Sequence, residues 1–150
     1  MKAAVLRAYR APLSIEDIDL LPPREGEIRI RFAASGICHS DMTRIEGARP
    51  SALPIVLGHE ASAYVEELGP GVDGLAPGDR VVLSFLYDCG RCFYCRTGHP
   101  NLCEIGIAML RGGTMPDGTT RLRKGDEVLH HMTVSSFAEQ AVVPARCATK

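Results

Sequence analysis

The sequence predicts one mostly β domain of short strands that carries an inserted cysteine-rich lobe. Three observations predict it. A chain of 150 residues can bury one core and is too short for two ordinary domains. Its 15 glycines and 10 prolines indicate many turns between short elements. Four of its six cysteines fall between residues 88 and 104, in a segment with too few apolar residues for a core of its own.

The elements follow from the local pattern of apolar and polar residues. Residues 27–32 alternate clearly, with the isoleucines and the phenylalanine on one face and the two arginines on the other. Strands are expected, in chain order, at residues 3–8, 14–19, 27–32, 61–68, 81–87 and 137–143. Residues 40–46, which lie between two glycines, predict a short helix, and two prolines mark an extended loop near residues 50–54. The run Met115-Pro116-Asp117-Gly118 predicts a turn with a hairpin around it.

Several classes of function are disfavoured by composition. A formal net charge of −1 does not favour a nucleic-acid partner, and the apolar runs are too short to span a membrane. The first residues reach a charge too soon for a secretory signal, so we expect a cytoplasmic, reducing location. Residues 69–74 fit a nucleotide-loop pattern, but the proline and glycine that follow prevent a long helix there. We interpret that segment as a bulged turn and expect no Rossmann unit within the chain.

The cysteine-rich lobe predicts a structural zinc site. Its candidate ligands are Cys89, Cys92, Cys95 and Cys103. Structural zinc takes four tetrahedral sulfur or nitrogen ligands, and two-residue spacers allow neighbouring thiolates to converge. An iron–sulfur cluster is an alternative, although the seven-residue gap does not match ferredoxin spacing. Two disulfides are a second alternative, disfavoured in a reducing compartment. A closed four-thiolate site would fold the lobe and do no chemistry.

Cys38 and His59 are candidates for a second metal site. Each is expected beside a glycine at the end of a strand, and each has a carboxylate nearby, at Asp41 and Glu60. A metal-bound histidine commonly donates its second N–H to a carboxylate. Taken separately, the two residues are more typical of a packed cysteine and a loop histidine. Taken together, the shared features give the metal-ligand interpretation more weight than either residue has alone.

Other thiols and imidazoles receive structural interpretations. We expect Cys147 to be buried in a strand-like ending without acting as a ligand. His99, in the lobe, and the pair His130-His131, in a predicted hairpin, are expected at the surface.

The motifs together carry a resemblance. Cys38-His39-Ser40-Asp41, Gly58-His59-Glu60, Pro77-Gly78-Asp79-Arg80-Val81 and the four-cysteine lobe resemble the medium-chain, zinc-dependent alcohol dehydrogenases. The similarity is to their N-terminal, GroES-like catalytic domain and covers essentially the whole chain. It implies a partly open barrel of short strands with a few short helices and the inserted zinc lobe at about residues 88–104.

The resemblance also implies the two metal sites. Cys38 and His59 would be two ligands of a catalytic zinc, and Asp41 would hold His59 in place. Glu60 would lie beside the metal, within reach of transient binding. The structural zinc would be held by Cys89, Cys92, Cys95 and Cys103.

Four further residues receive roles by the same resemblance. Ser40 would accept the substrate's hydroxyl proton and start its relay to solvent. Thr43 stands where many members have a histidine that completes the relay. His39 would contact the pyrophosphate of the coenzyme, and Phe85, at the end of its strand, would line the alcohol pocket.

The implied function is oxidation of an alcohol, with a primary alcohol favoured, to an aldehyde or ketone with NAD or NADP. Zinc would act as a Lewis acid on the bound alkoxide. The third ligand of the catalytic zinc and the Rossmann domain for the coenzyme would lie after residue 150, so the 150-residue chain alone is expected to be inactive. Its partners would be the alcohol or aldehyde and its own coenzyme domain, in a homo-oligomer. Alternatives are a zinc-stabilised GroES-like binding module, a polyol dehydrogenase and a relative of the quinone reductases.

Overall fold

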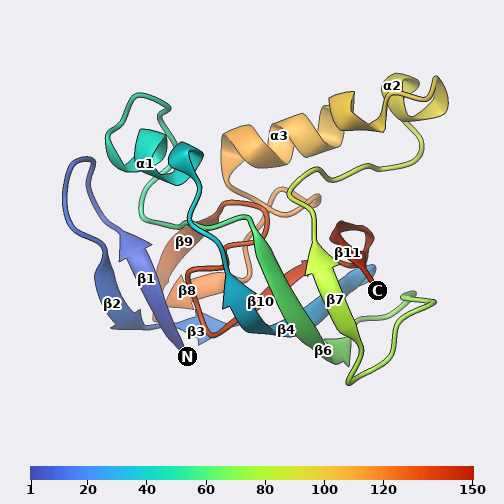
Figure 1. Ribbon diagram of the computed structural model, residues 1–150, viewed down its shortest axis with the longest axis horizontal. Helices are drawn as coiled ribbons and strands as arrows, with labels where there is room; N and C mark the ends of the chain where they lie inside the picture. Colours follow the sequence, from blue (N-terminus) through green and yellow to red (C-terminus); the bar gives the residue numbers. More distant parts are fainter.

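The computed structural model describes all 150 residues, which form two sheets and a few short helices (Figure 1). The six-stranded sheet has the order β2-β1-β5-β9-β8-β3, and the five-stranded sheet has the order β10-β4-β6-β7-β11. The strands are β1 (Lys2–Leu6), β2 (Ser14–Asp17), β3 (Asp19–Leu20), β4 (Glu27–Ser35), β5 (Ile55–Val56), β6 (Ala61–Leu68), β7 (Arg80–Leu83), β8 (Leu122–Lys124), β9 (Glu127–His131), β10 (Gln140–Pro144) and β11 (Ala148–Thr149). The mostly β, barrel-like fold is therefore confirmed.

Alternation positions the core of the five-stranded sheet. In β4, Ile28 and Ile30 are fully buried, whereas Arg31 is exposed and its guanidinium lies over the ring of Tyr64. The neighbouring β6 and β7 turn Val65 and Val81 into the same cluster. The strand expected at residues 61–68 has those bounds, and the one expected at residues 27–32 continues to Ser35.

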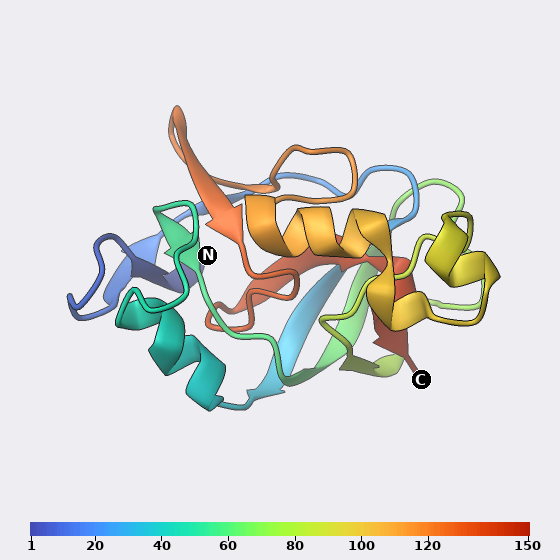
Figure 2. The same cartoon turned by 90° about the horizontal axis from the view of Figure 1, so that it is seen from above.

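The short helices lie on one side of the strands (Figures 1 and 2). They are α1 (His39–Ile45), α2 (Phe93–Arg96) and α3 (Glu104–Gly112), with single 3-10 turns at Pro100–Leu102 and Ala145–Cys147. The figures place α1 at one end of this side and α2, with the cysteine-rich lobe, at the other. The helix expected at residues 40–46 corresponds to α1. None of the helices is both long enough and apolar enough to cross a membrane.

Four sequence expectations about strands need correction, and the first is the strand expected at residues 3–8, which begins at Lys2 and ends at Leu6. The strand expected at residues 81–87 ends at Leu83, where the chain leaves the sheet for the lobe. The strand expected at residues 14–19 is interrupted at Ile18, which turns into the core between β2 and β3. The strand expected at residues 137–143 begins as a ladder only at Gln140.

The hairpin expected around residues 115–118 was wrong. The turn itself forms, since the Gly118 N–H donates to the Met115 carbonyl at 3.0 Å. However, α3 precedes it, and the hairpin is made by β8 and β9, which turn at residues 125–126. Residues 69–74 form turns with no helix after them, as expected for a segment that is not a nucleotide loop.

Candidate metal centres

Two strand ends bring Cys38 and His59 together. Cys38 follows the end of β4 and caps α1, and His59 lies between β5 and β6. One donor atom each from Cys38, His59 and Glu60 lies within 4.8 Å of the other two. A thiolate, an imidazole and a carboxylate are the donors that zinc takes in proteins. The donor set and spacing therefore fit zinc.

Asp41 ties the two ligand segments to each other. Its side chain is buried, and its carboxylate accepts the Cys38 N–H at 3.0 Å and the Gly58 N–H at 3.1 Å. The same carboxylate lies 3.3 Å from Nδ1 of His59, although that buried nitrogen makes no aligned hydrogen bond. Because Nδ1 faces Asp41, Nε2 is the nitrogen of His59 that faces the other donors. Asp41 thus holds backbone on both sides of the pair, in addition to facing the imidazole.

Ser40 and Phe85 also lie against His59. The Ser40 hydroxyl is 3.2 Å from Nε2 of His59. The Phe85 ring meets the imidazole edge-on, with ring centroids 5.2 Å apart. Phe85 is two residues beyond the end of β7 rather than in the strand as expected, and it is partly exposed. These two side chains border the metal pair, one with a hydroxyl and one with an apolar ring.

The other predicted site residues are on α1, which begins directly after Cys38, or directly follow His59. The Thr43 hydroxyl donates to the His39 carbonyl at 3.0 Å, one helical turn back. The side chain of His39 is exposed at the start of α1. Glu60 is exposed and reaches over Gly36, where a Cβ would lie 2.6 Å from the carboxylate. A side chain at position 36 would therefore displace the Glu60 carboxylate from this position.

The four-cysteine cluster forms the second centre. Cys89 precedes α2, Cys92 caps it, Cys95 lies within it, and Cys103 caps α3. The four sulfurs lie within 4.8 Å of one another, with 4.0 Å between Cys89 and Cys95. Tetrahedral zinc with Zn–S bonds of about 2.3 Å needs sulfurs about 3.8 Å apart. This spacing fits zinc and is far longer than the bond of about 2 Å in a disulfide.

Backbone amides donate hydrogen bonds to several of these sulfurs. The Cys92 N–H donates to the sulfur of Cys89 at 3.3 Å, and the N–H groups of Cys89 and Gly106 donate to the sulfur of Cys103 at 3.3 and 3.5 Å. A backbone hydrogen bond from Cys95 lowers the pKa of Cys92 to about 6, whereas burial raises the pKa of Cys95 to about 11. Donors to sulfur stabilise the charge that a metal ligand must carry.

Comparison with known proteins identifies the chain. Residues 24–150 match the alcohol dehydrogenase GroES-like domain family. The chain belongs to this family.

Individual relatives of the chain are named as dehydrogenases, which is consistent with this family. The NDMA-dependent alcohol dehydrogenase of Amycolatopsis methanolica is 43% identical over 150 residues, which are 99% of this chain and 40% of that protein. The S-(hydroxymethyl)glutathione dehydrogenase of Candida maltosa is 42% identical over 144 residues, 95% of this chain and 38% of that protein. The chain therefore spans about 40% of the length of these curated relatives.

Solved structures share the fold. An alcohol dehydrogenase zinc-binding domain protein from Burkholderia ambifaria superposes with a TM-score of 0.91 at 41% identity, over 99% of this chain and 41% of that one. The benzyl alcohol dehydrogenase of Acinetobacter calcoaceticus superposes with a TM-score of 0.89 at 33% identity, over 99% of this chain and 40% of that one.

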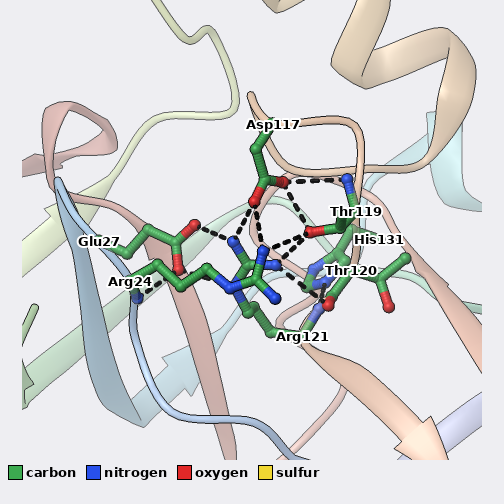
Figure 3. Close-up of polar contacts among 7 residues, drawn as sticks. All are labelled: Arg24, Glu27, Asp117, Thr119, Thr120, Arg121 and His131. Carbon is green, nitrogen blue, oxygen red and sulfur yellow. Dashed lines mark hydrogen bonds and ion pairs between the residues drawn. The ribbon is translucent and has the colours of Figure 1, made fainter.

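A buried ion-pair network in this GroES-like domain was missed from the sequence (Figure 3). The Arg121 side chain is fully buried and donates to both carboxylate oxygens of Glu27, at 2.5 and 2.8 Å. It also donates to Asp117 at 2.8 Å, and Asp117 pairs with the exposed Arg24 at 2.9 Å. The network joins the start of β4 to the turn at residues 115–118. Glu27 and Arg121 are 94 residues apart, so no local pattern of charges predicts their pairing.

The same network corrects one expectation. His131 is buried rather than at the surface, and its Nε2 accepts the Arg121 N–H at 2.9 Å. Burial, together with the charge of Arg121, lowers the pKa of His131 to about 3. His130 is half-buried, whereas His99 is exposed as expected. Cys147 is buried as expected, and burial raises its pKa to about 12.

A wide hollow of the molecule lies away from the Cys38–His59 centre. It measures about 1050 Å³ and is lined by charged side chains that include Arg24, Arg91 and Arg146. None of its lining residues belongs to that centre. The chemistry of the donors, not the size of a cavity, therefore locates the candidate active site.

Proposed function

We propose that this domain is the catalytic part of a zinc-dependent alcohol dehydrogenase. One observation carries the proposal: donors from Cys38 and His59 converge beside Ser40, while the four thiols of the lobe form a separate centre. Four protein ligands close a structural zinc site, whereas a catalytic zinc keeps a position for substrate. The pair offers fewer protein ligands than the lobe, which supports the assignment of one catalytic and one structural zinc per subunit.

The protein residues have distinct tasks in this function. Zinc at Cys38 and His59 would supply a Lewis acid that lowers the pKa of an alcohol hydroxyl. Ser40 accepts the hydroxyl proton, since its Oγ lies at the imidazole edge of the site. Thr43, three residues on along the same face of α1, passes the proton toward solvent through water.

The surroundings of the pair fit a small alcohol. Phe85 packs on His59 and gives the substrate carbon an apolar wall. Exposed His39 would contact the coenzyme pyrophosphate, and Glu60, whose carboxylate lies near Cys38 and His59, would be within reach of the metal for transient binding. Asp41 holds the pair in place through the Cys38 and Gly58 amides.

We further propose the parts that complete the enzyme. The relatives are about two and a half times as long, which supports a coenzyme-binding Rossmann domain and a third zinc ligand outside these residues. A primary alcohol is the favoured substrate, because relatives are named for benzyl alcohol and S-(hydroxymethyl)glutathione. The acceptor is NAD or NADP, and the enzyme works as a homo-oligomer in the cytoplasm.

Metal analysis with an alcohol assay tests the proposal on the full-length protein. We expect two zinc equivalents per subunit and coenzyme-dependent alcohol oxidation. Cys38→Ser should lower the zinc content to one equivalent and abolish oxidation, while the protein stays folded. The matched substitution Cys147→Ser removes a buried thiol outside both centres and should keep both equivalents. Two equivalents and full activity in the Cys38 variant would refute the assignment, and a single equivalent in the wild type would favour a zinc-stabilised binding module.

A further inference from the structure

A third segment of chain, residues 132–137, packs behind the metal pair. Its residues 132–136 are all buried. The Ser136 N–H donates to the Gly58 carbonyl at 3.1 Å, and the Phe137 N–H donates to the Leu57 carbonyl at 3.0 Å. These bonds hold the backbone that leads directly into His59.

The Ser136 side chain reaches the other ligand segment. Its hydroxyl lies 2.7 Å from the hydroxyl of Ser35, a hydrogen-bonding distance. Ser35 ends β4, three residues before Cys38. Ser136 therefore contacts the chain that carries Cys38 with its side chain and the chain that carries His59 with its backbone.

The fit around Gly58 is tight. Gly58 has φ +89°, and a Cβ there would lie 2.4 Å from the Ser136 hydroxyl and 2.6 Å from the Phe137 ring. Asp41 takes the N–H of Gly58 and Ser136 takes its carbonyl. The residue before His59 is thus held at both of its peptide groups.

The segment keeps this position in spite of backbone strain. Thr133 and Ser135 have φ of 57° and 56°, a left-handed conformation that is unusual for a β-branched residue in particular. The Met132 N–H donates a hydrogen bond to the Ser135 hydroxyl at 3.0 Å, which closes the turn. Strained conformations persist where the surrounding structure requires them, and they cluster at functional sites.

We propose that Ser136 is a positioning residue for the Cys38–His59 pair, acting through Ser35 and Gly58. The inference rests on the proposed function, in which this pair holds the catalytic zinc. Groups that orient metal ligands from outside typically change metal affinity by about 10- to 100-fold when they are removed. Removal of the Ser136 hydroxyl leaves its backbone bond to Gly58 in place and deletes only the contact with Ser35, so we expect an effect at the lower end of this range, about tenfold.

Two single variants and their combination test the proposal on the full-length protein. Ser136→Ala and Ser35→Ala each remove the hydroxyl pair, and exposed Ser35 can be changed with little risk to folding. The control is Thr120→Val, which deletes a buried hydroxyl that bonds the Leu122 carbonyl and neither ligand segment. We expect the Cys38–His59 site to bind zinc more weakly than the four-thiolate site, and we call it the weaker site. Chelator competition measures its affinity for zinc, and the visible absorption of the protein with cobalt in this site reports the geometry of its ligands.

We expect each serine variant to weaken the weaker site about tenfold and to shift its cobalt spectrum. The double variant should be no worse than either single, because both remove one shared contact. The four-thiolate site should keep its metal in every variant, and the control should match the wild type. The positioning role of Ser136 would be overturned if both serine variants kept the wild-type zinc affinity and cobalt spectrum, or if the control lost as much affinity as they do. Either result would leave the proposed function standing. A wild type with only one metal equivalent would overturn the proposed function and this inference together.

Discussion

Replacement of the buried Arg121 by methionine should destabilise the domain strongly. Methionine fills much of the same space but removes the cation that pairs with Glu27. That carboxylate is only 6% exposed and would keep one donor, the Arg24 N–H at 2.9 Å (Figure 3). Removing one partner of a buried ion pair typically costs about 3–5 kcal/mol, since the other charge stays unpaired away from water.

The exposure of the two carboxylates narrows the expected loss of stability in Arg121→Met. Asp117 is 39% exposed and retains Arg24 and Thr119, so it can be solvated at little cost once Arg121 is gone. The loss therefore comes mainly from Glu27, and we expect about 4 kcal/mol. That is a large fraction of the roughly 5–15 kcal/mol by which domains are stable.

Two further variants give the reasoning its control. Arg24→Met removes a cation from the same network, but its pair with Asp117 is exposed at both ends, so the expected loss is at most about 1 kcal/mol. Arg121→Met combined with Glu27→Gln removes both buried charges and should recover most of the stability.

Urea unfolding followed by circular dichroism, at a constant excess of zinc, measures all four free energies of unfolding. Equal losses for Arg121→Met and Arg24→Met would refute the argument. So would a double variant less stable than Arg121→Met.

Three further predictions address pH dependence and the metal pair. His131 has a pKa lowered from 6.5 to about 3 by burial and by Arg121, so below pH 6.5 the unfolded chain binds a proton that the folded domain refuses. Stability should therefore fall by up to about 1.4 kcal/mol per pH unit from pH 6.5 toward 3, and His131→Gln should flatten that slope in urea titrations; an unchanged slope would contradict it. Gly58→Ala places a Cβ against Ser136 at a φ of +89°, so it should lower the free energy of unfolding, measured by thermal unfolding, by about 3 kcal/mol and cause loss of zinc from the Cys38–His59 site. Wild-type stability would show that the neighbouring residues can move to accept the Cβ, against this prediction. Asp41→Asn replaces one hydrogen-bond acceptor by a donor, so it should lower the free energy of unfolding by about 1–3 kcal/mol and the zinc affinity of the Cys38–His59 site at least tenfold. Equal zinc affinities of the variant and the wild type in chelator competition would disprove this prediction.

The sequence predicted those features whose signal is local. Strands β4 and β6 were found because one buried face imposes alternation on neighbouring residues. The lobe was found because three of its thiols lie within seven residues, so that a short loop brings them to one ion. The motifs around Cys38 and His59 marked them as a pair through family resemblance, and the structure brings their donor atoms together.

Features that depend on distant contacts were missed. Helix α3 contains Gly106, a poor helix former, yet a Cβ there would lie 2.4 Å from the Tyr87 carbonyl. The glycine thus serves a close approach that no window of sequence records. His131 was expected at the surface because its burial depends on β9 pairing with β5, where it faces Val56 in the parallel register.

The sequence alone determined which residues alternate into the interior and which four thiols can share one ion, because both depend on a few neighbouring bonds. Only the tertiary structure decided that Asp41 accepts the N–H of Gly58 while Ser136 donates to its carbonyl. It also decided that Arg121 lies buried against Glu27. Those contacts join segments far apart in the chain. Their geometry exists only after burial of the apolar clusters has offset the entropy of closing the loops between them.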